Sequence, residues 1–295
     1  MRADLPADLA ELVSRPPVYR LLGVGEKVHG KHLNHVWKGL AGVPWLDEPA
    51  IPLFAKFLPK PGEIDIELGC GLASQVLKLP VPPPAIVLAG LDDLPQHPAN
   101  LTADQVILFG SLFQSPDPFL ARRTANDLQA AEFIWDQVCQ NEVGPVGAAW
   151  DELVANPDRH VQNLIFDGGK WWLFDHNMAL QPLSKLYAAL DDDGTQRKLI
   201  DHIARVNQII EQLKQRRAPV QEVRAQAEKL NRQSKRLKIL AIEMRKWHVD
   251  HPQVAQILKM ASVIVDLIAL RLAPLSMYID QRFDGPVEST LWIEP

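Results

Sequence analysis

Two aspartates and an asparagine lie near the middle of the sequence at a spacing that suits phosphate chemistry. Asp158 and Asn163 are five positions apart within NPDRHVQN, a predicted loop, and Asp175 follows twelve positions after Asn163. One carboxylate can orient or deprotonate an acceptor hydroxyl, while an amide oxygen and a second carboxylate are hard ligands that suit Mg²⁺ on nucleotide phosphates. The spacing therefore indicates a metal–nucleotide site.

Asn163 and Asp175 bracket a predicted β-hairpin. The apolar runs LIF and WWLF flank Asp167, Gly168 and Gly169, and Asp-Gly is a strong turn signal between β-forming residues. Because the two strands of a hairpin run antiparallel, the residues at their outer ends lie side by side. We therefore expect Asn163 and Asp175 to meet at one end of the hairpin.

A candidate cation for the phosphates lies upstream. Lys56 is in the predicted strand LFAKFLP, and Glu67 follows eleven residues later in a predicted helix. Lysine is a compact point charge that suits phosphate oxygens, and a strand lysine held by a helix glutamate is the arrangement of protein kinases. Lys60 is an alternative to Lys56, and Glu63 and Asp65 are alternatives to Glu67. Helical spacing and the comparison with the kinase arrangement together favour Glu67.

The order of predicted elements indicates an α+β fold. Short apolar runs separated by glycines and prolines predict strands from residue 18 to 58, and AIVLAG and QVILFGSLF predict two more. Between them, residues 62 to 79 repeat apolar side chains at helical spacing until PVPPP ends the helix. Later segments are helical, apart from the hairpin. We expect a strand-rich N-terminal lobe over residues 1–112 and a helical C-terminal lobe over residues 113–295, ending in a helical extension.

Four stretches carry a resemblance to a known family. They are FAKFL, ELGCGLASQVLKLPVPPPAIV, NPDRHVQNLIF and KWWLFDHNMAL. Over roughly residues 18 to 180 the chain resembles the HipA-like kinases, a bacterial branch of the protein-kinase-like fold that is also related to the phosphatidylinositol kinases. The resemblance implies a two-lobed kinase that uses ATP and Mg²⁺ and phosphorylates serine or threonine of a protein. A regulatory partner such as an antitoxin is implied by the family alone.

The resemblance also implies a role for each candidate residue. Asp158 would be the catalytic aspartate, Asn163 and Asp175 the magnesium ligands, Lys56 the phosphate-binding lysine and Glu67 its partner. The segment LFGSLFQ would be the hinge that holds adenine. The chain departs from kinases in lacking a G-x-G-x-x-G loop before the lysine, where only a turn at residues 30–35 offers a cover for phosphates. It also has no serine between residues 18 and 40, which argues against self-inhibition through a loop serine.

Simpler interpretations exist for several of these residues. Asp158 and Asn163 are also common turn formers. His160 is expected to be structural, Arg159 to position a neighbouring group such as a carboxylate, and His176 to be either structural or a support for the metal site. The fold does not fix the acceptor, so a kinase of a small molecule or lipid headgroup is an alternative, as is a non-catalytic binding module.

The bulk composition is that of a globular protein. Of 295 residues, 47% are hydrophobic and 23% charged, with a net charge of -5, which favours no particular partner. Two cysteines in predicted helices and an N-terminus without a long apolar run predict a reduced, cytoplasmic setting. The apolar segment 254–275 carries a central aspartate, which indicates a buried helix rather than a membrane span.

One segment has a strong local charge. Residues 214–246 hold eleven Lys or Arg and three Glu, a local charge of +8. The simplest interpretation is a solvated helical face, and an acidic partner is the alternative. Because aromatic residues are absent until Trp247, nucleic acid ranks below the solvated face.

Overall fold

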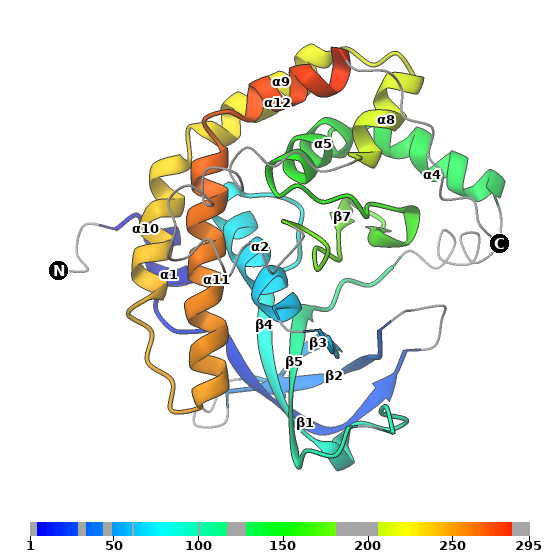
Figure 1. The fold of residues 1–295 in the computed structure, drawn as a ribbon. Helices are drawn as coiled ribbons and strands as arrows, with labels where there is room; N and C mark the ends of the chain where they lie inside the picture. Colours follow the sequence, from blue (N-terminus) through cyan, green and yellow to red (C-terminus); the bar gives the residue numbers. More distant parts are fainter. Residues whose placement is uncertain are drawn as a thin grey trace.

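The structure is a computed structural model that describes residues 5–28, 34–43, 49–60, 62–99, 101–116, 128–180 and 206–284 (Figure 1). A strand-rich first part is followed by a helical second part, as the sequence predicts. The mixed composition of strands and helices is therefore confirmed, whereas the division into two lobes at residue 112 stays a prediction. The predicted phosphate-covering turn at residues 30–35 and the helical segments between 181 and 205 lie wholly or largely outside the described residues.

The first part is built on a closed five-stranded barrel. Its neighbouring strands follow the order β1-β2-β3-β5-β4, and β1 closes the barrel by pairing in parallel with β4 while every other pair is antiparallel. The sequence predicted these strands but not the closure, because closure depends on a pairing between strands far apart in the chain. The strands are β1 (Val18–Lys27), β2 (Val36–Gly42), β3 (Ile51–Lys56), β4 (Pro84–Gly90) and β5 (Gln105–Leu112).

The barrel interior is filled by side chains from all of its strands. Trp37 and Leu53 are fully buried, and Val87 and Leu108 pack in the same cluster. Alternation along each strand sends one set of side chains inward, which is why apolar residues recur at every second position in these runs. The indole Nε1–H of Trp37 donates to the carbonyl oxygen of Pro95 at 2.8 Å, so this large side chain is buried with its polar group satisfied.

Helix α2 (Glu63–Leu77) connects β3 to β4 and lies at the centre of the molecule (Figure 1). Gly62 precedes it with φ +83°, a left-handed conformation that glycine adopts without strain. Thirteen of its fifteen residues are buried, including Glu63, Asp65 and Glu67. Carboxylates buried in a central helix require partners, and their partners lead to the candidate site.

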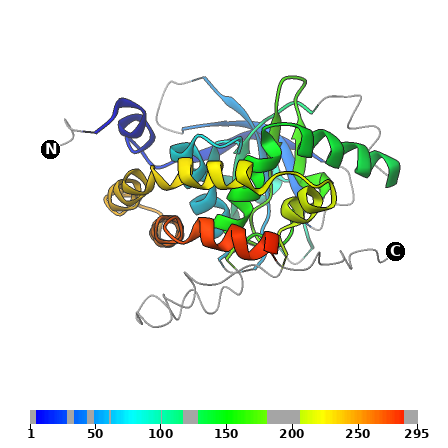
Figure 2. The same cartoon turned by 90° about the horizontal axis from the view of Figure 1, so that it is seen from above.

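The second part is helical apart from a short hairpin. Helix α5 (Val143–Leu153) packs against α8, α9 and α12, and Figure 2 shows α9 and α12 running side by side. The hairpin consists of β6 (Leu164–Phe166) and β7 (Trp171–Leu173) and follows α5 after a loop. The remaining helices are α4 (Leu128–Gln140), α8 (Gln208–Gln215), α9 (Val220–Asn231), α10 (Ser234–Met244), α11 (Pro252–Arg271) and α12 (Leu275–Asp284).

C-terminal helices return to cover the N-terminal part. Helix α11 packs along α2 and α10, and the short helix α1 (Ala7–Leu12), which the sequence did not predict, lies beside α10 (Figure 1). The indole of Trp247 donates to the carbonyl oxygen of Val13 at 3.1 Å. One apolar cluster consequently runs from α2 through α11 to α5, so the barrel has its own core and the helices share another.

Helix α11 is the one described helix that is long and apolar enough to cross a membrane. It packs against α2 and α10, and Val254, Leu258, Val265 and Ile268 are buried in the shared core. The central Asp266 pairs with Arg245 of the segment after α10. These contacts agree with the prediction of a core helix.

Candidate active site

Lys56 lies at the end of β3, where the barrel faces α2 and the hairpin. Its Nζ is 3.4 Å from Oε1 of Glu67 and 2.6 Å from Oδ1 of Asp175. Three residues that the sequence analysis selected from a strand, a helix and the end of a hairpin are therefore in contact. The rival Lys60 is 74% exposed and, among the described residues, pairs only with Glu63, at 3.8 Å, so the structure separates the two lysines clearly.

Burial and charge shift the pKa values of Lys56, Glu67 and Asp175. Burial lowers the pKa of Lys56, but the carboxylates of Glu67 and Asp175 outweigh it and leave that pKa above its usual value. Burial raises the pKa of Glu67 to about 7. Burial also acts to raise the pKa of Asp175, but the ammonium of Lys56 holds that pKa below its usual value. Lys56 and Asp175 thus form an ion pair at neutral pH, with Glu67 as the residue that gains or loses a proton.

The hairpin brings Asn163 and Asp175 to the same end, as its predicted geometry required. Leu164 pairs with Leu173, and the backbone N–H of Phe174 donates to the carbonyl oxygen of Asn163 at 2.9 Å. Asp175, just beyond, has φ +58°, in the left-handed region that non-glycine residues rarely adopt. Strain of this kind, about 1–2 kcal/mol, persists where surrounding contacts enforce it, and the bond to Lys56 is one of them.

Asp158 and Asn163 are joined within the loop that precedes the hairpin. The amide Nδ2 of Asn163 donates to the backbone carbonyl of Asp158 at 2.9 Å, which leaves the Oδ1 of Asn163 as its acceptor end. The backbone N–H of Asp158 donates to the side chain of Asn156, so a local turn does form here. Burial raises the pKa of Asp158, and the charges of Asp175 and Lys56 act on it as well.

Arg159 holds the loop against helix α5 and the hairpin. Its Nε and Nη2 donate to the two carboxylate oxygens of Asp151, at 3.0 and 2.9 Å, and both side chains are fully buried. Its Nη1 donates to the backbone carbonyl oxygens of Asn163 and Phe174, which lie side by side at the open end of the hairpin, before β6 and after β7. The expectation that Arg159 positions a carboxylate partner is met by Asp151. The sequence analysis did not identify this partner; the available signal was the pair of acids Asp151 and Glu152 in the otherwise apolar segment VGAAWDELVA.

His176 lies behind the site and supports it. Its Nε2 accepts hydrogen bonds from Nε1 of Trp150 at 2.9 Å and from Nη2 of Arg159 at 3.0 Å. Two donors at Nε2 place the proton on Nδ1, which is 3.9 Å from Oε2 of Glu67. Burial holds the pKa of His176 well below its usual value, so the ring is neutral. Its backbone N–H also donates to Glu67, at 3.0 Å, which ties the end of the hairpin to α2.

The residues near Asp175 suit a magnesium ion bound together with nucleotide phosphates. Asp175 remains 30% exposed, and Asn163 keeps an amide oxygen as acceptor, so both can offer the hard oxygen ligands that Mg²⁺ prefers. No group of three His, Cys, Asp or Glu side chains in the described part of the chain is placed to hold a metal alone. Phosphate and water oxygens complete the coordination of magnesium at nucleotide sites, so two protein ligands fit this chemistry.

The predicted adenine hinge lies beside the lysine. Leu108 to Leu112 belong to β5, and Phe109 pairs with Lys56 across the β3–β5 ladder. Phe113, just beyond β5, packs its ring against Phe54 with centroids 5.0 Å apart. His35, at the edge of the predicted phosphate cover, bonds with Nζ of Lys27 at 2.6 Å. Residues 30–33 of that cover lie outside the described residues.

Comparisons with known proteins show a kinase-like fold. No family model matches the chain, and no curated protein matches its sequence. The structure is similar to the crystal structure of the Helicobacter pylori proinflammatory kinase CtkA, with a TM-score of 0.51 and 12% sequence identity. The match covers 89% of this chain and 97% of that one. At this identity the likeness establishes the fold alone; membership of the HipA-like kinases stays a prediction.

Proposed function

We propose that this protein transfers the γ-phosphoryl group of ATP to a hydroxyl group, in a reaction that depends on Mg²⁺. The observation that carries the proposal is the contact of Lys56 with both Glu67 and Asp175. A buried cation is costly unless it is paired, and Lys56 is paired with two carboxylates from different elements. Its ammonium faces the end of the hairpin where phosphates would bind. The similarity of the fold to a solved kinase supports the same proposal.

Each residue has a role that follows from its chemistry. Lys56 binds phosphate oxygens, and Glu67 holds the lysine in place. Asn163 and Asp175 provide oxygen ligands for Mg²⁺, which neutralises phosphate charge when bound. Asp158 orients the acceptor hydroxyl and accepts its proton, a task that suits a carboxylate whose pKa burial has raised.

The acceptor that we propose is a serine or threonine of a protein. This step rests on the resemblance to HipA-like kinases in NPDRHVQN and KWWLFDHN.

We further propose that residues 1–112 form the nucleotide-binding lobe and that residues 113–295 form the lobe with the loop containing Asp158. We also propose that the protein acts in the cytoplasm. A small-molecule or lipid-headgroup kinase uses the same residues and differs only in which acceptor takes the phosphate.

Transfer of labelled γ-phosphate tests the proposal. Wild type is incubated with Mg²⁺ and labelled ATP, alone and with protein, small-molecule and lipid acceptors in separate reactions. Label that appears with wild type and disappears in Asp158→Ala and Asp175→Ala supports a kinase with this active site, and the acceptor that takes it identifies the class. Absence of label in every reaction, together with no thermal stabilisation by Mg²⁺-ATP, would contradict it.

A further inference from the structure

A cleft lies away from the candidate active site, on the far side of the hairpin. It has a volume of about 390 Å³ and is enclosed by the C-terminal end of α2, the turn between α4 and α5, the tip of the hairpin, and α9. None of Lys56, Glu67, Asp158, Asn163 or Asp175 lines it. A cavity of this size is within the range of ligand sites, about 300–1,000 Å³.

Four apolar side chains form the floor of the cleft, beside polar residues that include Asn141 and Gln226. Trp171 of the hairpin and Leu230 of α9 are buried, at 7% and 3% exposure, and Phe166 and Val146 are half-buried beside them. These side chains come from three elements that are far apart in the sequence. Such a surface favours a large aliphatic or aromatic side chain of a ligand, because its burial removes apolar area from water on both sides.

The rim of the cleft is basic. Lys78 at the end of α2, Lys170 in the hairpin turn and Lys229 of α9 are all exposed, and Glu142 is the one carboxylate among the lining residues. The Nζ of Lys78 is 3.9 Å from a carboxylate oxygen of Asp8, but both side chains are largely exposed, so the pair contributes little. Lys229 has no ion pair with any described residue. The ammonium of Lys170 lies over the ring of Trp172, 3.7 Å from its centroid, but the side chain is exposed, so all three lysines can reach an anionic ligand.

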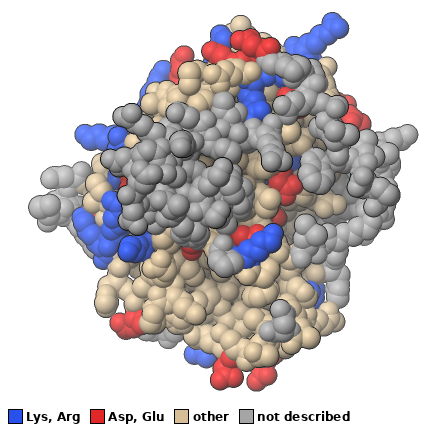
Figure 3. Space-filling view, in the orientation of Figure 1, with Lys and Arg blue, Asp and Glu red and all other residues tan. Residues whose placement is uncertain are grey.

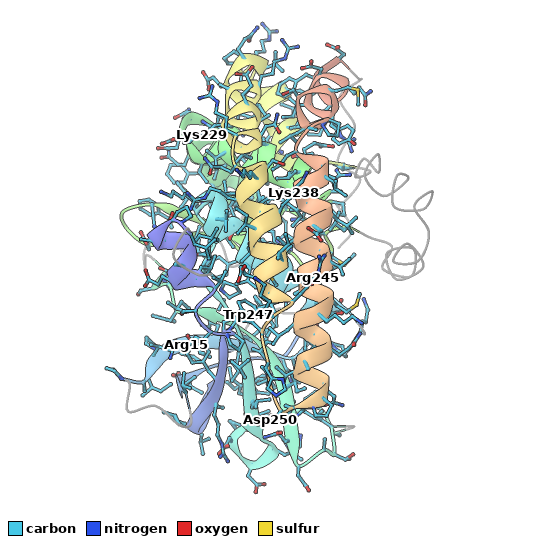
Figure 4. The ribbon with its side chains drawn as sticks, turned by 90° about the vertical axis from the view of Figure 1, so that its left-hand side faces the viewer. Arg15, Lys229, Lys238, Arg245, Trp247 and Asp250 are labelled. Carbon is cyan, nitrogen blue, oxygen red and sulfur yellow. The ribbon has the colours of Figure 1, made fainter. Side chains whose placement is uncertain are left out.

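The basic surface continues from the rim along α10. Lys235, Lys238, Ile242 and Arg245 follow one another at three- or four-residue spacing, and all four are exposed on the outer side of the helix and the residue after it. Figure 4 shows that Lys229, Lys238 and Arg245 lie along the same side of the molecule, and Figure 3 shows basic side chains at the left-hand edge, where α10 lies. Ile242, 50% exposed, places an apolar side chain among these cations.

We propose that the cleft and the basic side of α10 together bind an acidic peptide segment of a partner protein. One large apolar side chain of the peptide occupies the cleft against Trp171 and Leu230. Carboxylates on either side of it pair with Lys78, Lys170 and Lys229, and those further along pair with the lysines of α10. Charge complementarity identifies this occupant, since a cationic rim around an apolar floor matches an acidic segment that carries one apolar residue.

The aromatic side chains of the cleft favour a peptide over a single-stranded nucleic acid. Bases bind such surfaces by stacking on open aromatic faces. The aromatic side chains that line the cleft are Trp171, only 7% exposed, and the half-buried Phe166. Their rings pack against each other with centroids 5.3 Å apart, which leaves little open face for a base to stack on. A peptide side chain that inserts into the cleft does not need an open ring face, because it contacts the apolar side chains of the floor.

Selection from a library of random short peptides tests the inference. Peptides displayed on phage are selected on the full-length protein, and the affinities of the enriched peptides are measured by fluorescence anisotropy at low and high salt. We expect enriched peptides to combine several Asp or Glu with one Leu, Ile, Phe or Trp. Their affinity should fall as salt rises, because most of the pairing charges are exposed to solvent.

Variants locate the binding site. The double variant Lys170→Glu with Lys229→Glu should lower the affinity for the selected peptides at least about tenfold, because two attractive charges become repulsive. Val146→Trp, which fills the cleft, should weaken them similarly. Lys259→Glu makes the same charge change on an exposed lysine of α11 and should leave the affinity unchanged. Circular dichroism and thermal unfolding confirm that each variant is folded.

Three results would overturn the inference. They are a selection without enrichment, enriched peptides without an acidic and apolar composition, and binding that the rim variants do not weaken. Single-stranded polyuridylate and vesicles containing phosphatidylserine are tested in parallel. If either binds and loses affinity in the rim variants while no peptide does, the surface serves a nucleic acid or a membrane instead. These readouts do not depend on phosphoryl transfer, so failure of one proposal leaves the other intact.

Discussion

Lys56 Nζ lies 2.6 Å from Oδ1 of Asp175, so an ammonium on a barrel strand meets a carboxylate that is 119 positions further along the chain. The same nitrogen is 3.4 Å from Glu67 on the central helix. This contact joins the barrel, α2 and the hairpin at one point. Each of the predictions about activity depends on whether that point is where phosphates bind.

Replacement of Lys56 by methionine should abolish phosphoryl transfer. The side chain keeps a similar length but loses the charge that binds phosphate oxygens, and we expect the rate of label transfer to fall at least about 100-fold. Lys60→Met is the matched control, because Lys60 is 74% exposed and its one ion pair in the described part of the chain is with Glu63. Equal activity of the two variants would show that Lys56 does not act on the phosphates.

Asp175→Asn and Asp158→Asn should have different effects on magnesium. Asp175→Asn removes a charged metal ligand, so it should abolish label transfer. It should also abolish the additional thermal stabilisation of the protein that ATP gives when Mg²⁺ is present. Asp158→Asn should abolish transfer but keep that stabilisation, because Asp158 acts on the acceptor. Asp104→Asn, at an exposed position before β5, is the control and should change neither. Loss of magnesium stabilisation in Asp158→Asn alone would reverse the two roles.

Arg159→Met should destabilise the fold strongly. The variant leaves the carboxylate of Asp151 fully buried without its cation, and such losses cost about 3–5 kcal/mol. Urea unfolding followed by circular dichroism measures the change in the free energy of unfolding. Asp151→Leu in the same chain should recover part of the loss, because it removes the unpaired charge. Arg232→Met, at an exposed position after α9, should change stability by less than about 0.5 kcal/mol.

The sequence predicted the local elements of the site better than their surroundings. A short apolar run bounded by prolines located β3, helical spacing located α2, and a turn signal located the hairpin. The side chains selected on them, Lys56, Glu67, Asn163 and Asp175, are ones that the structure brings together or places at one end of the hairpin. The elements are local features, because each depends on periodicity or on a short turn, whereas Lys56 and Glu67 were selected for their likeness to the lysine and glutamate of protein kinases. The roles of the same residues stay predictions until the variants above are measured.

What the sequence did not predict depends on contacts between distant segments. Closure of the barrel requires β1 to pair with β4, across more than sixty residues of the chain. The partner of Arg159 is Asp151 on α5, and Glu67 accepts a hydrogen bond from the backbone of His176, whose ring is held by Trp150. No local pattern specifies which buried polar group meets which, because such pairs form only when the helices and the hairpin pack. The cleft beside α9 is likewise a product of packing.

Gly69→Ala should destabilise the contact between α2 and α11. A methyl group at this position would lie 2.7 Å from Cγ2 of Ile264 and 3.1 Å from the backbone oxygen of Ala261, so α11 would have to move. Forcing a methyl group into a packed core costs about 1–3 kcal/mol. Gly169→Ala, whose added carbon meets only Asp167 at 3.5 Å, is the control and should cost much less. Equal midpoints of urea unfolding for the two variants would contradict the close packing of these helices.

The two cysteines should react slowly with thiol reagents in the folded protein. Burial raises the pKa of Cys139 to about 11 and raises that of Cys70 well above its usual value. Since the thiolate is the reactive form and a raised pKa lowers its fraction, the rate of Cys139 modification should grow about tenfold per pH unit from pH 7 to 10. Cys70 is fully buried and should react only after unfolding in urea. Modification by a maleimide, followed by mass spectrometry of wild type and Cys139→Ser, measures each rate, and a plateau in the Cys139 rate below pH 9 would show that its thiol is not shielded as the structure indicates.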